Sequence, residues 1–340
     1  MTVHPMSNPV SVDAMAPPWP ITFQDVLETR ERLAPYLTPT PLRHYPLLDQ
    51  LIGGGTSLLV KHENHQPTGS FKVRNGLSFI TGLSDDDRHA GVVAASTGNH
   101  GQGVAYAASL LGVNAVICVP VGNNPEKGAA MRSWGATVVE SGRDYDESVQ
   151  AMLRIARDEG RAVSHSTNDP RVVSGAATMS LEMLEQSGGL DAIVVAVGGG
   201  SQSVGALTVA RELAPSLEVY GAQCAGAAAI HDSWHAKAPR ATARADTFAE
   251  GVATRQPYGL TFSTLQAGLT GFVTVTDADL AETIRVILRT THNLVEGAGA
   301  LGVAAALKLR DRLKGKRVGV IFSGGNIDTA VLRRILNNEM

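Results

Sequence analysis

Short, continuous apolar runs alternate with helix-length segments along most of the chain. Runs of strand length cover residues 57–60, 92–95, 115–119, 137–140, 192–197, 217–223, 272–275 and 317–322. Segments suited to helices lie between them at 99–111, 145–159, 172–186, 204–213 and 279–291. Strands that are apolar throughout and separated by helices are typical of parallel sheets covered on both faces. The pattern predicts an α/β fold with open, mostly parallel sheets flanked by helices.

Two segments lack this alternation. Residues 1–21 contain repeated prolines and no hydrophobic period, which predicts a flexible leader. Thr22 can then cap a first helix over Phe23–Leu33. The polar, alanine-rich stretch 235–256 is expected to be an irregular excursion at the surface.

Composition narrows the class of protein. A chain of 340 residues can form two domains, and its net charge of −3 offers no basic surface for nucleic acid or an anionic membrane. No apolar run approaches the ~18 residues that span a bilayer, and no secretory signal is evident. Cys118 and Cys224 form neither a disulfide framework nor a zinc motif. We therefore expect a cytoplasmic enzyme that binds no nucleic acid and no membrane.

Three of the predicted strands run into turns rich in glycine and hydroxyl residues. These turns cover residues 96–101, 198–203 and 323–326. In an open α/β sheet, ligands bind beyond the carboxyl ends of the strands, and bare amides at a helix start suit an anion. The 198–203 turn has Ser203 where a dinucleotide fingerprint has its third glycine, and no P-loop lysine follows. A compact monophosphate fits this turn better than a dinucleotide.

Lys72 lies near the start of a helix predicted from residue 71, between Phe71 and Val73. Burial and the positive end of the helix dipole both lower the pKa of a lysine in such a place. A neutral amine can attack a carbonyl and form a Schiff base; the alternative is a lysine that extends from an apolar patch to water. Together with a phosphate loop and hydroxyl-bearing turns, the lysine indicates pyridoxal phosphate.

Four motifs carry a resemblance to a known family. Gly69-Ser70-Phe71-Lys72, Ser96-Thr97-Gly98-Asn99-His100, Gly198-Gly199-Gly200 and Ser323-Gly324-Gly325-Asn326 occur in the order found in fold-type II pyridoxal-phosphate enzymes, the group of tryptophan synthase β. Within it the chain is similar to the serine/threonine dehydratases (ammonia-lyases) and serine racemases. Val295-Glu296-Gly297-Ala298-Gly299 resembles a further motif of this family.

The resemblance implies a role for each candidate residue. Lys72 would be the catalytic lysine. The other cofactor-binding residues would be Phe71, Asn99, Gly198, Gly199, Gly200, Ser201, Glu296 and Ser323. The substrate would be bound by Ser96, Thr97, Gly98, Asn99, His100 and Thr167. Taken singly, Asn99 and His100 could only start a helix, Ser323 could be a turn residue, and Glu296 a solvated first-turn acid.

The resemblance also implies architecture and activity. A large cofactor domain would comprise 22–90 and 169–336, a small mobile domain 91–168, and the chain would form a homodimer. The expected reaction is removal of water from an L-β-hydroxy-α-amino acid (threonine, serine or a bulkier analogue), giving a 2-oxo acid and ammonia. Racemisation or β-replacement with the same cofactor, and non-catalytic binding, are the alternatives. His100 stands where cysteine-synthase-like enzymes have threonine, which counts against β-replacement.

Several positions depart from the family pattern. Ser201 replaces the fourth glycine of the phosphate loop, Gly297 replaces a proline, and Asn75 precedes the glycine that follows the lysine motif. Where metal-binding members have two acidic residues, this chain has Gln223 and Ala229. Because hard cations require charged oxygen ligands, we expect no divalent metal there.

Overall fold

The computed structural model describes residues 19–340, so most of the predicted leader lies outside the described residues. The larger of its two sheets has the strand order β1-β2-β10-β7-β8-β9. Its strands are β1 Leu42–His44, β2 Ser57–Lys61, β7 Ala192–Ala196, β8 Glu218–Cys224, β9 Gly271–Val275 and β10 Arg317–Ile321. Only β1 is antiparallel to its neighbour in this sheet.

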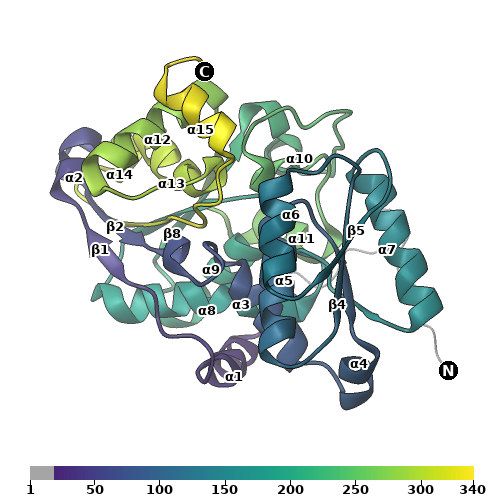
Figure 1. Cartoon of the computed structure of the whole chain (residues 1–340). Coiled ribbons are helices and arrows are strands. Elements are labelled where there is room, and N and C mark those ends of the chain that lie inside the picture. Colours follow the sequence, from purple (N-terminus) through teal and green to yellow (C-terminus); the bar gives the residue numbers. More distant parts are fainter. Residues whose placement is uncertain (1–18) are drawn as a thin grey trace.

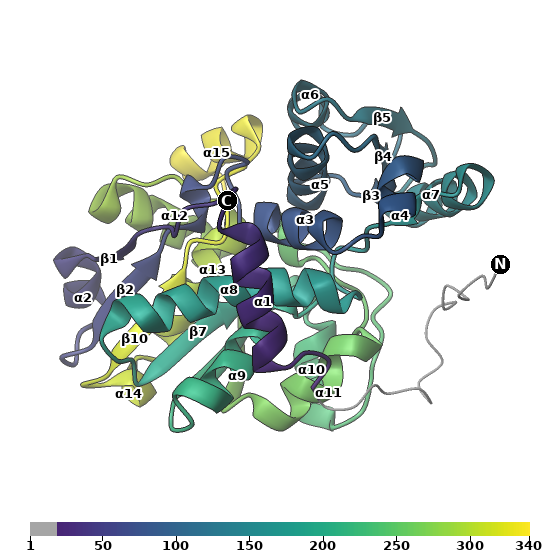
Figure 2. The same ribbon diagram turned by 90° about the horizontal axis from the view of Figure 1, so that it is seen from below.

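The smaller sheet is entirely parallel, with the order β5-β4-β3-β6. Its strands are β3 Val92–Ala95, β4 Ala115–Val119, β5 Thr137–Glu140 and β6 Ala162–Val163. Figures 1 and 2 show the two sheets in separate lobes of the molecule. The predicted fold class of two open, mostly parallel sheets is therefore confirmed.

Helices cover both faces of each sheet (Figure 2). One face of the large sheet packs against α1 Phe23–Leu33, α8 Pro170–Ser187, α9 Ser201–Leu213 and α11 Gly259–Gly268. Its other face packs against α2 Pro46–Ile52, α12 Asp277–Thr291, α13 Gly297–Lys308 and α15 Thr329–Leu336. The small sheet lies between α7 Tyr145–Glu159 and a layer of α3 Lys72–Thr81, α5 Asn99–Leu110 and α6 Pro125–Ser133. The remaining helices are α4 Asp85–Ala90, α10 Ala229–Ala236, α14 Arg310–Leu313 and the 3₁₀ turns Glu63–His65, Ala225–Ala227 and Glu250–Val252.

The local signals of the sequence account for these bounds. Thr22 caps α1 in a reciprocal box with Asp25, as its position predicted. The strands predicted at 92–95, 115–119 and 137–140 form with the predicted bounds. The sequence pattern missed β1 and β6, which span three and two residues and are only partly buried. Strands this short owe their conformation to the neighbouring strand.

Helix α3, which begins at Lys72, touches both halves of the molecule. Its apolar residues Val73, Leu77 and Ile80 belong to the same core as β3 and β4 of the small sheet. It also packs closely against α8, which covers the large sheet. The domain boundaries at 90/91 and 168/169 stay a prediction, because α3 is shared by both lobes in its packing.

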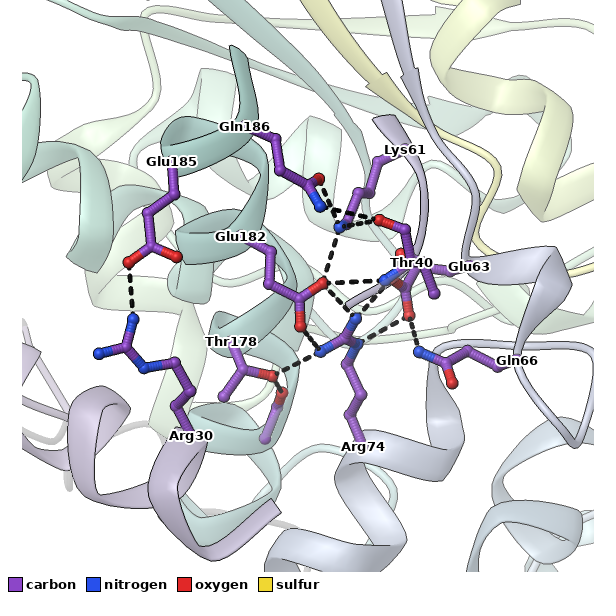
Figure 3. A network of polar contacts seen from close by, with 11 residues as sticks. Arg30, Thr40, Lys61, Glu63, Gln66, Arg74, Thr178, Glu182, Glu185 and Gln186 are labelled. Atoms are coloured by element: carbon purple, nitrogen blue, oxygen red, sulfur yellow. Dashed lines mark hydrogen bonds and ion pairs between the residues drawn. The ribbon is translucent and has the colours of Figure 1, made fainter. Parts of the chain in front are cut away.

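A buried network of charged groups fixes α3 against the large sheet (Figure 3). The Arg74 guanidinium donates two hydrogen bonds to Glu63, two to Glu182 and one to Thr178, which uses all five of its N–H groups. Lys61 donates to Glu182, Gln186 and the Thr40 carbonyl, which uses all three of its own. Burial alone would raise the pKa of Glu63, but Arg74, Thr40 and Lys61 together outweigh it and lower that pKa. The charges of the two cations and the two carboxylates in this network thus neutralise one another.

Removing one member of this network should therefore destabilise the fold strongly. Arg74→Met leaves two buried carboxylates short of partners, and breaking a buried ion pair in this way costs about 3–5 kcal/mol. Urea unfolding followed by circular dichroism measures the change in the free energy of unfolding. Arg157→Met is the matched control, because Arg157 pairs with Asp158 at the surface. Equal stability of the two variants would show that the network contributes nothing.

Candidate active site

The lysine motif and the 323–326 turn are joined through their backbones. Strands β2 and β10 are parallel neighbours, so the chain leaves both at the same edge of the sheet. There Ser70 forms a bridge with Gly324, and the Phe71 amide donates to the Ser323 carbonyl at 3.0 Å. The Gly325 amide donates back to the Gly69 carbonyl at 2.9 Å. Sheet register alone therefore places Ser323 beside the segment that ends in Lys72.

Lys72 ends inside the molecule and does not extend to solvent. Its Nζ donates to the Ser166 carbonyl at 2.8 Å and lies 5.0 Å from the centre of the Phe71 ring. Burial lowers the pKa of the Lys72 ammonium to about 8, in the direction that the sequence predicted. At pH 7 roughly a tenth of such an amine is neutral, which is some hundreds of times more than for an exposed lysine.

The 96–100 loop reaches across from the small sheet to these motifs. Asn99 donates from Nδ2 to Glu296 Oε1 at 2.6 Å, and its Oδ1 accepts a hydrogen bond from Asn326 at 2.7 Å. Helix α5 has Gly98 at its cap position, with no side-chain cap. The alternative that Asn99 only caps its own helix is therefore wrong. Its amide nitrogen retains a second hydrogen for a further acceptor.

Two other residues of this loop use their side chains locally. Ser96 Oγ accepts hydrogen bonds from the amides of Gly98 and Gly101, which orders the turn before α5. His100 is buried, with Nε2 3.0 Å from the Ser164 carbonyl, and burial lowers its imidazole pKa to about 3. The ring is thus neutral at pH 7. What the loop offers an anion is its backbone amides at the positive end of α5.

Glu296 is enclosed by the other motifs. Burial raises the pKa of its carboxyl to about 7, against the opposing effect of the Asn99 hydrogen bond. A Cβ on Gly324 would lie only 2.6 Å from Glu296 Oε1, so a glycine is needed there to admit the carboxyl group. The alternative of a solvated first-turn acid is wrong.

The three glycines of the 198–201 loop are crowded by neighbouring backbone and side chains. A Cβ on Gly198 would lie 2.7 Å from the Gly251 carbonyl, and one on Gly199 would lie 2.1 Å from Thr167 Oγ1. Gly200 has φ +100°, a left-handed conformation that glycine adopts freely, and α9 begins at the next residue. The three glycines thus form a cradle that no side chain could share.

The residues present fit a phosphate ester bound at this loop. The hydroxyls of Ser70 and Ser203 are buried and have no hydrogen-bond partner among residues 19–340. Buried polar groups are nearly always paired in folded proteins. The Ser203 hydroxyl lies in the first turn of a 13-residue helix, beside bare amides, and therefore suits an anionic group with several acceptor oxygens. Ser70 lies beside Gly324 instead.

Sequence reasoning missed several contributors to the site. The 235–256 stretch was expected to be a surface excursion, and this is wrong for its last part, where Ala249 and Val252 are buried in the core. Gly251 faces Gly198, because a Cβ on Gly198 would lie only 2.7 Å from the Gly251 carbonyl oxygen. The apolar residues 248, 249 and 252 in this polar stretch were the available signal. The Ser166 carbonyl gave no signal, because any residue has one.

Gln223 and Ala229, which stand in place of two acidic residues, lie near the end of β8 and at the start of α10. Gln223 Oε1 accepts hydrogen bonds from the amides of Ile230 and His231 at the start of α10. Within residues 19–340 no group of three or more histidine, cysteine or acidic side chains could hold a metal ion. Nor does any helix in that range combine the length and apolarity needed to cross a bilayer.

Comparison with known proteins places this geometry in a family. Residues 33–324 match the model of the family described as pyridoxal-phosphate dependent enzyme. The chain is 36% identical to an L-threonine ammonia-lyase of Thermotoga maritima over 320 residues, covering 94% of this chain and 79% of that protein. It is 35% identical to an L-threo-3-hydroxyaspartate ammonia-lyase of a Pseudomonas species, covering 90% and 96%.

A solved structure agrees with the sequence comparisons. Maize serine racemase superimposes with a TM-score of 0.89 at 28% identity, over 94% of this chain and 98% of that one. The family match covers far more than half of the chain, and it includes every motif described above except the last residues of the 323–326 turn. The chain therefore belongs to the pyridoxal-phosphate dependent enzymes, as a lyase of the ammonia-lyase group.

Proposed function

We propose that this enzyme removes water from an L-β-hydroxy-α-amino acid and releases a 2-oxo acid and ammonia, with Lys72 as its catalytic base. The observation that carries the proposal is the position of the Lys72 amine. Its lowered pKa makes it a base near neutral pH. Through Ser166 and Thr167 it is connected to the 198–201 cradle, and its helix packs on α5, which begins at the 96–100 loop.

The cofactor would be held by groups from both lobes. The residues that would hold it are Lys72, Phe71, the 198–201 amides, Asn99, Glu296 and Ser323, and contacts between these motifs support this assignment. Pyridoxal phosphate supplies a carbonyl carbon for an amine and a ring that draws electrons from the substrate's α-carbon. Ser323 presents a neutral hydroxyl where a carboxylate would strengthen that withdrawal. A weaker withdrawal favours prompt loss of the β-substituent over slower alternatives.

The chain's own groups then account for the rest of the reaction. The amides of residues 96–100, at the positive end of α5, bind the substrate carboxylate. Lys72 Nζ takes the proton from the α-carbon. As the bond to the β-hydroxyl breaks, a proton passes to its oxygen, so the proton that Lys72 gains is balanced and the hydroxyl leaves as water. The enamine that is released takes up water and splits into 2-oxo acid and ammonia. Overall the amino acid loses ammonia and no oxidant is required.

The location and the oligomeric state of the enzyme are further parts of the proposal. We expect a cytoplasmic homodimer that acts on a free amino acid, as family membership favours. Light scattering of the purified protein measures the oligomeric state directly.

Lys72→Ala should abolish turnover, with a loss of at least about a thousandfold in kcat. Borohydride reduction should fix the cofactor to the peptide that contains Lys72, as mass spectrometry of a digest would show. Lys308→Ala, at a partly exposed lysine paired with Asp279, is the control and should retain activity and label. Recovery of the label on any other lysine would refute this role.

Glu296 should make folding depend on pH. Because burial raises its pKa to about 7, the folded protein keeps a proton that the unfolded chain has already lost, so stability falls as pH rises from about 4.5 to 7. Glu296→Gln should remove this loss, so the variant gains stability relative to the wild type between pH 5 and pH 8. Urea midpoints of the ligand-free proteins measure it, with exposed Glu282→Gln as control. A difference in stability between the wild type and Glu296→Gln that does not change with pH would contradict the raised pKa of Glu296.

Racemisation is the second candidate, which the similarity to a serine racemase favours. A racemase needs a proton donor on the face of the α-carbon opposite Lys72, and Thr97 occupies the position of the corresponding serine. Its β-branched side chain has fewer χ1 choices than serine. We therefore expect L-substrates to give 2-oxo acid with little D-isomer. Chiral chromatography during turnover decides it, and D-isomer forming as fast as oxo acid would favour the racemase.

A further inference from the structure

Two helix caps from opposite lobes are hydrogen-bonded to each other. Asn124 caps α6, and its Oδ1 accepts hydrogen bonds from two amides in the first turn of that helix. Asp328 caps α15, and its Oδ1 accepts hydrogen bonds from two amides of α15 in the same way. The other end of each cap meets its counterpart, because Asn124 Nδ2 donates to Asp328 Oδ2. Figure 2 shows α6 and α15 in different lobes, so this bond joins the lobes.

A second contact joins the same turn of α6 to the lobe of the large sheet. The Lys127 ammonium pairs with Glu250, which begins the 3₁₀ turn at 250–252. The Lys127 side chain is only 13% exposed, whereas that of Glu250 is 57% exposed. Salt screens a partly buried charge less than a fully exposed one. We call Asn124, Lys127, Glu250 and Asp328 the lobe latch.

The small-sheet end of the lobe latch is packed on the loop proposed to bind the substrate carboxylate. A Cβ on Gly98 would lie 3.9 Å from Lys127 Cδ, and a Cβ on Gly101 would lie 2.8 Å from Met131 Cε of α6. The glycines of the loop thus bring its backbone directly against α6. A displacement of α6 would therefore displace the 96–100 loop.

The other end of the lobe latch adjoins the two turns proposed to hold the cofactor. Asp328 comes two residues after the 323–326 turn. Glu250 precedes Gly251, whose carbonyl oxygen lies 2.7 Å from a Cβ built on Gly198 of the cradle. The lobe latch therefore connects the carboxylate loop to both cofactor turns, through side chains that touch none of the reacting groups.

We propose that the lobe latch sets the distance between the substrate carboxylate and the cofactor, with Asn124 and Lys127 as positioning residues. The inference rests on the proposed function for the role of the 96–100 loop, and it assigns how that loop is held. Displacement of a bound substrate by about 1 Å can cost a hundredfold in rate. Both contacts of the latch are hydrogen bonds to a carboxylate outside the cores, so they can open for exchange of ligands without repacking either lobe.

The test reverses the bond between the two caps. Asn124→Asp keeps an oxygen to cap α6 but turns a carboxylate toward Asp328, and Asp328→Asn keeps an oxygen to cap α15 but turns one amide N–H toward another. We expect each single variant to raise KM for the amino acid at least about fivefold. The double variant Asn124→Asp/Asp328→Asn again pairs one donor with one carboxylate, so KM should return to within about twofold of the wild type.

Two measurements follow these variants. The first is kcat and KM of the holoenzyme with L-threonine or L-serine, whichever gives 2-oxo acid faster. The second is hydrogen exchange of the substrate-free holoenzyme, read by mass spectrometry on peptides that cover 96–101. Exchange there should be at least about threefold faster in each single variant and normal in the double variant. Lys127→Gln removes the second contact and should also speed this exchange.

Asp144→Asn is the matched control. Asp144 caps α7 through the Glu147 amide at the surface, so this variant should leave both KM and exchange unchanged. Single variants that behave as the wild type, or a double variant that restores neither quantity, would overturn the inference while the proposed reaction stands. If the wild type forms no oxo acid from either substrate, the proposed function fails and the positioning role falls with it, whatever the exchange rates.

Discussion

The close approach of α3 to its neighbouring helices is the constraint on which the site depends. A Cβ on Gly76 would lie 2.2 Å from the Gly103 carbonyl of α5, and one on Gly103 would lie 2.3 Å from the Lys72 carbonyl. On the opposite side, a Cβ on Gly175 of α8 would lie 2.5 Å from the Arg74 carbonyl. Backbone thus touches backbone on both sides of α3. The first turn of this helix, and with it Lys72, cannot move without displacing both lobes.

Polar contacts add to the close packing at these glycines and fix the position of α3 and α5. The Arg74 network fixes α3 to β2 and α8 through charged groups with no free donor, while Asn99 joins α5 to the segments that carry Glu296 and Asn326. Burying such groups is costly unless every one of them has a hydrogen-bond partner. The network is therefore satisfied in one arrangement of the helices. In that arrangement the Lys72 amine lies on the side of α3 that faces the 96–100 and 198–201 turns.

Much of this arrangement could be predicted because strong local patterns and global packing agree. The strands at 92–95 and 115–119 are apolar along their length, and the turn after β7 carries Gly198 and Gly199 where neighbouring residues leave no room for a side chain. The shift of the glycine after the lysine motif, with Asn75 ahead of Gly76, marks the position that meets α5. By contrast, the Ser166 carbonyl and the 250–255 segment contribute through backbone or through contacts across the cleft. Neither the residue types nor their spacing in the sequence predict such contacts.

Two ion pairs join the two lobes near the candidate site. Lys127 pairs with Glu250 and Arg255 with Asp146, and each pair connects the lobe of the small sheet to one loop of the other. Because each pair is neutral as a whole, the fields that act on the site come from the helix starts at α5 and α9 and from Lys72. Both helix starts favour an anion. In the proposed reaction the start of α9 would bind the cofactor phosphate and the start of α5 the substrate carboxylate.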